Sequence, residues 1–350
     1  MLAHIHSATL SGVRGHPVDV EVHVANGLPG FTVVGLPDAS CREARDRVRA
    51  ALLSCGEEWP QRRITVNLAP SELKKSGAGL DLAIAVGVLA AAGGIDAERL
   101  GDTAFLGELG LDGSIRPVRG ALPMADAMEA ETLVVARSNV REVALLGADR
   151  VRAVDSLADL LACLRNERTW SAPDVVDRPA PSGPNADLLD IRGQSTAKFA
   201  LALAAAGGHH LLMVGPPGAG KTMLARRLVG LLPTLAADHA LEVTRIQSAA
   251  GELDRDRLPP STPPFRAPHH SASAVSLVGG GSHSMRPGEV SLAHRGVLFL
   301  DELGEFSPAS LDGLRQPIEE GEVRVSRGHG TASYPADVLL VAAMNPCPCG

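Results

Sequence analysis

The clearest chemical signal in the sequence is a glycine-rich loop that ends in lysine and threonine. It reads Gly-Pro-Pro-Gly-Ala-Gly-Lys-Thr over residues 215–222 and directly follows an apolar run at 211–214. Glycines at this spacing let backbone N–H groups close around phosphate oxygens, and a helix starting near Lys221 aims its positive end at them. Lys221 is expected to reach the β- and γ-phosphates, and Thr222 to ligate Mg²⁺. The loop predicts a site for ATP and Mg²⁺ built from Gly215, Pro216, Pro217, Gly218, Ala219, Gly220, Lys221, Thr222 and Met223.

Such a site needs carboxylates, and two of them follow a second apolar run. Residues 297–300 are Val-Leu-Phe-Leu, and Asp301 and Glu302 come next, as expected for a buried strand that ends in acids. Asp301 is expected to hold Mg²⁺ and Glu302 to act as general base toward the attacking water. A third apolar run at 338–343 precedes Asn345, which could orient that water. The alternative for this last segment is a simple chain turn at Pro346.

Length, charge and composition limit the class of protein. The 350 residues are enough for two domains, each with its own core. The net charge of −7 argues against a surface that coats nucleic acid generally, although a ring could still concentrate basic residues in its pore. Aromatic residues make up only 3% of the chain, which disfavours recognition by base stacking. The chain has no basic-then-apolar start and no apolar stretch near 18 residues, so we expect a cytoplasmic protein without a membrane partner.

The cysteines do not form a disulfide pattern. There are five, at scattered positions except for the Cys347 and Cys349 pair, and reduced thiols are expected. The pair could be half of a metal site, but two ligands cannot close a tetrahedral zinc site. Because the sequence stops soon after a core strand and its polar residue, we also expect a truncated chain.

Residues 1–168 have the pattern of an α/β domain. Valines alternate with polar residues at 18–24 and apolar residues alternate again at 64–68, which predicts two half-buried strands. Ser40 and Glu43 form a capping box for a helix that ends at Gly56, and the apolar run 80–92 predicts a buried helix. Further short strands are expected at 103–107, 115–118, 132–136 and 151–154, with helices at 120–130, 139–146 and 156–165.

Residues 171–187 contain four prolines and little apolar content, which predicts a linker. Helices are then expected at 194–206, from Lys221 to about 232, and at 308–319, while 239–250 is ambiguous between helix and strand. Two alternating runs at 322–326 and 331–334 predict a β-hairpin. Its Arg324, Arg327 and His329 make it a candidate for facing nucleic acid, and an ordinary solvated hairpin is the alternative.

An unusual segment lies between the two halves of the nucleotide site, at residues 265–296. Leu277 and Val278 precede three glycines and read as the tip of a hairpin or loop that contacts a substrate, with a flexible surface connection as the alternative. His269, His270, His283 and His294 could suggest a metal, but their spacing is not that of a ligand set.

With these parts aligned, residues 190–350 resemble the YifB/ComM family of magnesium-chelatase-like AAA+ ATPases. The resemblance rests on GPPGAGKT, FRAPHH, SLVGGGS, RPGEVSLAHRGVLFLDE and AAMNPCPCG. It implies that Lys221 and Thr222 belong to the Walker A motif, Asp301 and Glu302 to Walker B, and Asn345 to sensor 1. It also implies that the glycine segment and the hairpin at 322–334 face the pore of a homo-hexameric ring. In this family the in-trans arginine and the lid would lie beyond Gly350, and Arg315 is a weak internal substitute for that arginine.

The first half resembles the ribosomal-S5-like domain of Lon-type proteases, through residues 79–85 and 106–118. By this resemblance, the positions of the protease Ser–Lys dyad hold Gly79 and Leu122, so a peptidase is not expected. Ser76 with Lys74 or Lys75 is the only local substitute, and it reads as an exposed loop. The expected fold is therefore α/β, with an S5/Lon-protease-like domain at 1–168, a linker at 169–187 and a AAA+ P-loop core with a three-layer αβα architecture at 188–350.

The resemblance implies an ATP-driven motor that acts on single-stranded or branched DNA, with branch migration or helicase activity in natural transformation and recombination. Two alternatives stay open. One is a protein-remodelling ATPase of the magnesium-chelatase type. The other is a binding module that ATP switches without turnover.

Overall fold

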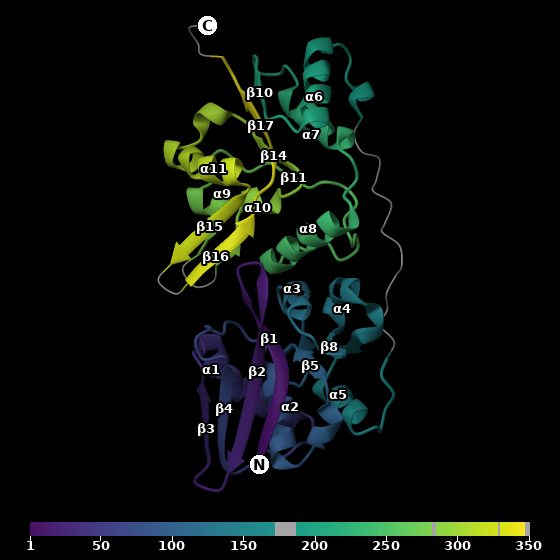
Figure 1. Cartoon of the computed structure of the whole chain (residues 1–350), viewed down its shortest axis with the longest axis vertical. Coiled ribbons are helices and arrows are strands. Elements are labelled where there is room, and N and C mark those ends of the chain that lie inside the picture. The colour runs from purple at the N-terminus through teal and green to yellow at the C-terminus, as the bar shows by residue number, and fades with distance from the viewer. Residues whose placement is uncertain (172–186, 282–284, 328–329, 347–350) are drawn as a thin grey trace. The chain divides into compact units, whose positions relative to one another are not determined.

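The computed structural model describes residues 1–171, 187–281, 285–327 and 330–346, and the chain divides into two compact units (Figure 1), Met1–Asp177 and Arg178–Gly350. Most of the segment expected as a linker, 172–186, lies outside the described residues. None of the helices found in the described part of the chain is long and apolar enough to cross a membrane.

The first unit contains a seven-stranded mixed sheet in the order β3-β4-β2-β1-β5-β8-β9. β1 and β2 pair antiparallel, as do β2 and β4, whereas β1, β5, β8 and β9 run parallel to one another. The strands are β1 (Leu2–Ser11), β2 (Arg14–Ala25), β3 (Gly30–Val34), β4 (Arg63–Ala69), β5 (Thr103–Leu106), β8 (Thr132–Ala136) and β9 (Val151–Val154), with a small ribbon of β6 (Glu108–Leu109) and β7 (Ile115–Arg116).

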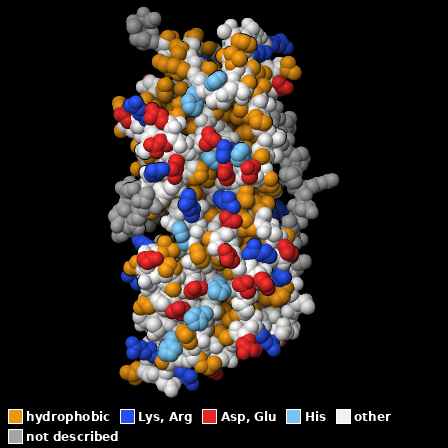
Figure 2. Space-filling model, in the orientation of Figure 1, with side chains coloured by type: hydrophobic (Ala, Val, Ile, Leu, Met, Phe, Trp, Pro, Cys, Tyr) orange, Lys and Arg blue, Asp and Glu red, His pale blue; other side chains and the backbone are white. Residues whose placement is uncertain are grey.

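Two apolar clusters show which helices cover which face of this sheet. Phe105 and Val134 point into the cluster formed with α1 (Ala39–Ser54), α2 (Asp81–Ala92) and α5 (Leu157–Leu164). Their neighbours Ala104 and Leu133 point into the other cluster, formed with α3 (Ala121–Asp126) and α4 (Val140–Val143). Side chains alternate across a strand, so adjacent residues serve opposite faces. On part of the sheet the second face is open, and Figure 2 shows histidine and acidic side chains over β1 and β2.

Several local predictions for this unit need correction. Helix α1 starts at Ala39 and is capped by Asp38, whose side chain accepts from the N–H of Cys41, so the expected Ser40 capping box is wrong by two residues. Asp38 has extended backbone angles and an acidic acceptor, which are what an N-cap requires. The strands β1 and β3 were not predicted. Helix α2 was, and its residues from Asp81 to Ala91 are all buried.

The second unit contains a four-stranded parallel sheet in the order β10-β17-β14-β11. The strands are β10 (Leu211–Val214), β11 (Phe265–Arg266), β14 (Val297–Leu300) and β17 (Leu339–Met344), and two ribbons join β12 (Gly279–Gly280) to β13 (Arg286–Pro287) and β15 (Glu322–Arg327) to β16 (Gly330–Pro335). The helices are α6 (Ser195–Gly207), α7 (Lys221–Leu228), α8 (Ala237–Ala250), α9 (Ala274–Val278), α10 (Glu289–Leu292) and α11 (Pro308–Glu320).

Both faces of this sheet are covered. Phe299 and Val341 pack with residues of α6 and α7, while Leu298, Leu300 and Ala342 are buried on the opposite side. The layers and the order of parallel strands give the expected three-layer αβα core. The ambiguous segment 239–250 is helical, as part of α8. Leu277 and Val278 are not a loop tip, because they end helix α9, and Leu277 is fully buried.

Candidate nucleotide-binding site

The glycine-rich loop joins β10 to helix α7. Gly218 and Gly220 have φ angles of +80° and +84°, which L-residues with a side chain rarely adopt. Pro216, Pro217 and Gly218 are exposed, so the loop backbone is open to a ligand. The first residue of α7 is Lys221, so the free N–H groups of its first turn lie next to the loop. Loop and helix start together form a cradle for an anionic group.

The Lys221 ammonium lies inside the curve of this loop. It donates to the carbonyl oxygens of Gly215 at 2.6 Å and Pro216 at 3.0 Å, and to Asn345 Oδ1 at 3.0 Å. Asn345 directly follows β17, the strand next to β10, so their carboxyl ends meet at one edge of the sheet. The fold therefore brings together two predicted site residues that are 124 positions apart.

A second contact joins helix α7 to the end of β14. Thr222 Oγ1 donates to Asp301 Oδ2 at 2.6 Å, and the other carboxylate oxygen of Asp301 accepts from the N–H of Glu302 at 3.0 Å. A hydroxyl and a carboxylate in direct contact are two oxygen ligands that one Mg²⁺ could share. Met223, on the next position of α7, is exposed with 43% of its surface accessible.

Glu302 projects from a strained turn after β14. Its φ angle is +55°, which is uncommon for a residue with a side chain. Its Oε2 atom lies 3.1 Å from His270 Nδ1, and more than half of the Glu302 side chain is exposed. The carboxylate is thus held beside the candidate Mg²⁺ ligands, within reach of water.

One further polar contact to the loop involves Gln194, which the sequence analysis did not single out. Its side-chain nitrogen donates to the carbonyl oxygen of Ala219 at 3.2 Å, and its backbone is left-handed with φ at +57°. Gln194 occupies the N-cap position of α6 without making a capping hydrogen bond. Glutamine is not a favoured N-cap residue. Its presence at the start of α6 is therefore the sequence signal that could have indicated another role for Gln194.

The four histidines considered for a metal do not gather. The rings of His269 and His270 are tilted against each other with centroids 4.0 Å apart, His294 is buried elsewhere, and His283 lies outside the described residues. No group of three or more possible metal ligands occurs among the residues that the structure describes. Cys347 and Cys349 are also outside that part.

His294 belongs to a cluster at the opposite, amino-terminal end of the strands. Burial lowers the pKa of His294, whose Nδ1 accepts from the N–H of Asp337 at 3.1 Å and whose Nε2 lies 3.2 Å from Glu242. Burial alone would raise the pKa of Glu242, but hydrogen bonds from His294 and Arg295 lower it. These contacts tie α8 to the starts of β14 and β17 and place none of these residues in the nucleotide site.

The two segments expected to contact a substrate are both strand pairs. The glycines of β12 pair with β13, and β15 pairs with β16 over six residues. Arg324 is exposed and lies 3.0 Å from Glu322, while the side chains of Arg327 and His329 fall outside the described part. Arg315 is exposed on α11, where it pairs with Glu319.

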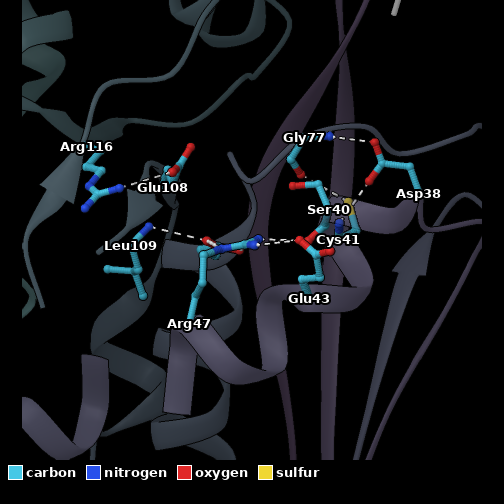
Figure 3. A network of polar contacts seen from close by, with 10 residues as sticks. Asp38, Ser40, Cys41, Glu43, Arg47, Gly77, Glu108, Leu109 and Arg116 are labelled. Carbon is cyan, nitrogen blue, oxygen red and sulfur yellow. Dashed lines mark hydrogen bonds and ion pairs between the residues drawn. The ribbon is translucent and has the colours of Figure 1, made fainter. Parts of the chain in front are cut away.

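The first unit holds a second charged cluster around Arg47 (Figure 3). Asp81 is 1% exposed and accepts from Arg47 at 2.6 and 3.0 Å and from the N–H of Leu109 at 3.4 Å. Burial raises the pKa of Asp81 to about 6, although Arg47 acts in the opposite direction. Asp38 accepts from the N–H groups of Cys41 and Gly77. Burial also raises the pKa of the Cys41 thiol to about 12.

The loop next to this cluster also differs from expectation. Lys75 is fully buried and donates to the carbonyl oxygen of Pro70, and burial lowers its pKa. The N–H of Ser76 donates to Thr9 Oγ1 at 3.2 Å. The interpretation of Ser76 and Lys75 as an exposed loop is therefore wrong for Lys75, because its long side chain turns inward to a backbone carbonyl. Leu122 is fully buried, and Gly79 is half-buried.

Two family models match the chain, and both are models of the ChlI subunit of magnesium chelatase. The model for magnesium chelatase, subunit ChlI, matches residues 187–350, and that for subunit ChlI of Mg-chelatase matches residues 20–139. An uncharacterized Mycobacterium tuberculosis protein is 49% identical over 98% of this chain. The competence protein ComM of Haemophilus influenzae is 47% identical and YifB of Salmonella typhimurium 46% identical, each over 100% of this chain. In all three cases the match covers 69% of the relative.

A shorter similarity concerns the fold. Lon protease 2 of Bacillus subtilis is 32% identical over 143 residues, which are 38% of this chain and 25% of that protease. Together with the magnesium chelatase match, it agrees with the α/β architecture of the two units.

Proposed function

Because this chain belongs to the YifB/ComM family of magnesium-chelatase-like AAA+ ATPases, we propose that it hydrolyses ATP with Mg²⁺ and uses the cycle to move or remodel DNA. The observation that carries the proposal is the meeting of three separate segments at one sheet edge. Lys221 contacts Asn345, and Thr222 contacts Asp301, so the loop, β14 and β17 converge on the same point.

The residues fit a nucleotide and its cation. Gly218 leaves open space where a Cβ would stand, so phosphate oxygens can approach the loop backbone. The Lys221 ammonium is satisfied by uncharged oxygens that a phosphate can replace. When bound, ATP would supply the phosphoryl group, and Mg²⁺ would supply positive charge that neutralises the negative charge of the phosphates.

Each side chain then has one task. Lys221 binds the phosphates, and Thr222 and Asp301 hold the cation. Glu302 takes a proton from the attacking water, and Asn345 orients that water. These side chains need to do little covalent chemistry, because catalysis of phosphoryl transfer depends mainly on positioning and charge stabilisation.

The DNA part of the proposal is supported by one relative and by the hairpin β15–β16. The relative ComM is described as a competence protein, and Arg324 exposes a guanidinium on the hairpin β15–β16. We propose that DNA contacts this hairpin and the β12–β13 ribbon. In this proposal the chain forms a homo-hexameric ring in the cytoplasm, and its activity is branch migration or DNA unwinding by a helicase. The magnesium chelatase match favours protein remodelling as the second candidate.

The first experiment measures ATP affinity and steady-state ATP hydrolysis for the chain and for two variants. Lys221→Ala should abolish nucleotide binding, whereas Glu302→Gln should keep binding and lose turnover, because only the second residue acts on the water. Unchanged ATP affinity in the Lys221 variant would contradict the site assignment. Binding by the chain without turnover in any condition would instead support the ATP-switched module.

Adding single-stranded or branched DNA to the same assay tests the substrate. Stimulation by either DNA supports the motor on DNA, and turnover indifferent to both favours protein remodelling. Stimulation by DNA that persists at the same level in Glu302→Gln would show a contaminating ATPase.

A further inference from the structure

Helix α1 of the first unit carries a row of arginines on its surface. Arg42, Arg45 and Arg49 are all exposed, and their spacing of three and four residues places them next to one another on one side of the helix. Within the part of the chain that the structure describes, none of their guanidinium groups has a hydrogen bond or an ion pair. These three residues are called the arginine stripe below.

Other arginines of the same unit are neutralised by acids. Arg99, Arg116 and Arg137 each form an ion pair with an aspartate or a glutamate, at 3.6, 3.9 and 2.8 Å. On α1 itself, Arg47 turns inward and donates to Asp81. The arginine stripe differs from all of these, because its three positive charges are available to a partner.

The packing of α1 does not use the arginine stripe. The helix packs on α2 and on the edge strand β3 (Figure 1) through a different, buried set of residues, which are Cys41, Ala44, Val48, Ala51 and Leu52. Like charges three and four residues apart repel each other on a helix surface. The stripe therefore disfavours the helix slightly and contributes nothing to the core, and an anion bound to it would offset that repulsion.

The charges around the stripe do not cancel it. Glu43 lies 3.7 Å from Arg47, on the side that faces away from the stripe. Asp46 is exposed and, among the described residues, forms no ion pair with the arginines beside it. Lys74 is exposed in the loop 70–77, which contacts the first turn of α1, and it adds positive charge there. The surface thus stays basic although the whole chain has a net charge of −7.

The chemistry of the stripe fits phosphate groups along a duplex. The guanidinium fork matches the geometry of phosphate oxygens. The seven residues from Arg42 to Arg49 advance by about 10 Å along the helix axis, which is about three nucleotides of a DNA strand at about 3.4 Å each. Residues 39–54 include no aromatic side chain that could stack on an unpaired base. All exposed residues from 42 to 49 are charged, so the apolar centre of a protein interface is missing there.

We propose that the arginine stripe binds the phosphate backbone of duplex DNA. Each arginine contacts one phosphate, and because phosphates are the same at every base pair, the contact does not depend on the DNA sequence. This inference goes beyond the function proposed above, because it assigns a DNA contact to the first unit. It requires neither a bound nucleotide nor the two ribbons of the second unit.

The test compares two triple variants of the chain. The stripe variant combines Arg42→Gln, Arg45→Gln and Arg49→Gln, and glutamine is nearly as good a helix former as arginine, so α1 should keep its structure. The control variant combines glutamine substitutions of three paired arginines of the same unit, at positions 99, 116 and 137, and it removes the same charge. A urea titration followed by tryptophan fluorescence confirms that both variants fold.

Binding to a mixed-sequence DNA duplex is measured without ATP over a range of salt concentrations. Each lost phosphate contact lowers the slope of log K against log salt by about 0.9, so the stripe variant should lose about 3 in slope. The control variant should keep the slope of the unmodified chain. Asp46→Asn removes the one negative charge within the stripe, and it should raise duplex affinity by about two- to fivefold.

The other results would overturn the inference. An unchanged slope in the stripe variant would show that α1 does not contact DNA, and an equal loss in the control variant would show attraction by net charge alone. A single strand of the same length is the further probe. If the stripe variant loses as much affinity for the single strand as for the duplex, the stripe binds polyanions generally and the assignment to duplex DNA is wrong.

This test is independent of the proposed ATPase function. The stripe variant should hydrolyse ATP as the unmodified chain does when no DNA is present, and Lys221→Ala should bind the duplex with the same salt slope as the unmodified chain. Absence of ATP turnover would therefore contradict the proposed function and leave the stripe in place. A slope that fell in Lys221→Ala as much as in the stripe variant would show that the duplex binds at the second unit instead.

Discussion

The two charged clusters of this chain contain similar groups and differ in how these groups are satisfied. In the second unit, Thr222, Glu302 and Asn345 are exposed, and each contact can be exchanged for a ligand. In the first unit, Asp81 is sealed beneath Arg47 and the N–H of Leu109. Solvent access therefore distinguishes a group available for chemistry from one that holds two helices and a ribbon together.

The comparison predicts opposite results for two aspartates. Asp301→Asn removes a carboxylate from the proposed cation, so ATP turnover should fall by about 10³-fold, which is ~4 kcal/mol of transition-state free energy. The free energy of unfolding should change by less than about 0.5 kcal/mol, because the side chain is only half-buried and the amide can still accept from Thr222. Steady-state hydrolysis and a denaturant titration check both values. A large loss of stability would place Asp301 with the structural cluster.

For Asp81→Ala we expect the reverse pattern. The substitution leaves Arg47 without its carboxylate in a largely buried position, which should lower the free energy of unfolding by about 3 kcal/mol. Both tryptophans, Trp59 and Trp170, belong to the first unit, so their fluorescence during a urea titration reports on that unit. ATP binding should persist under conditions in which this unit stays folded. Equal stability of the two chains would mean that the Asp81–Arg47 pair contributes nothing.

The sequence was most informative where a function needs fixed residue types. The loop at 215–222, the acids after β14 and Asn345 after β17 could be proposed from the sequence, because phosphate and Mg²⁺ chemistry restricts which residues such a site uses. That Lys221 lies next to Asn345 followed only from the strand order, which brings β17 beside β10. The contact of His270 with Glu302 depends on the register of β11 against β14 and could not be read from spacing.

The errors in the fold have physical causes as well. Strand β1 buries Ala3, Ile5 and Ser7 where β2 buries four valines, so its alternation is less apolar than that of β2. Asp38 and Ser40 are both good N-cap residues, and tertiary contacts chose Asp38, which also accepts from the N–H of Gly77. The burial of Lys75 depends on a carbonyl five residues away and leaves no mark in the pattern.

The pH dependence of stability sharpens the contrast further. Burial raises the folded-state pKa of Asp81 to about 6, above its ordinary value of 3.8. Between these values the folded state binds more protons than the unfolded state, so this group's stabilisation is complete below about pH 4 and is lost as pH rises through 6. The slope should be about −1 kcal/mol per pH unit in this window.

Asp81→Asn should remove that slope, since the amide does not titrate but still offers an oxygen to Arg47. Urea titrations followed by tryptophan fluorescence at pH 4, 5 and 6 measure the difference between the two chains. A variant whose stability kept the same dependence on pH would show that another group titrates there.

The smallest expected effect concerns the hairpin β15–β16. Arg324→Ala removes one exposed guanidinium, so DNA affinity should fall by a few-fold and the slope of log K against log salt should decrease by about 1. Arg315→Ala is the matched control, because Arg315 is another exposed arginine, on α11, that also pairs with a glutamate. Binding to single-stranded DNA is measured over a range of salt concentrations. The same slope in Arg324→Ala and the unmodified chain would show that this hairpin does not contact the DNA. Equal losses of affinity in Arg324→Ala and Arg315→Ala would indicate attraction by net charge alone. Only a contact at a defined place makes the effects of two similar arginines differ.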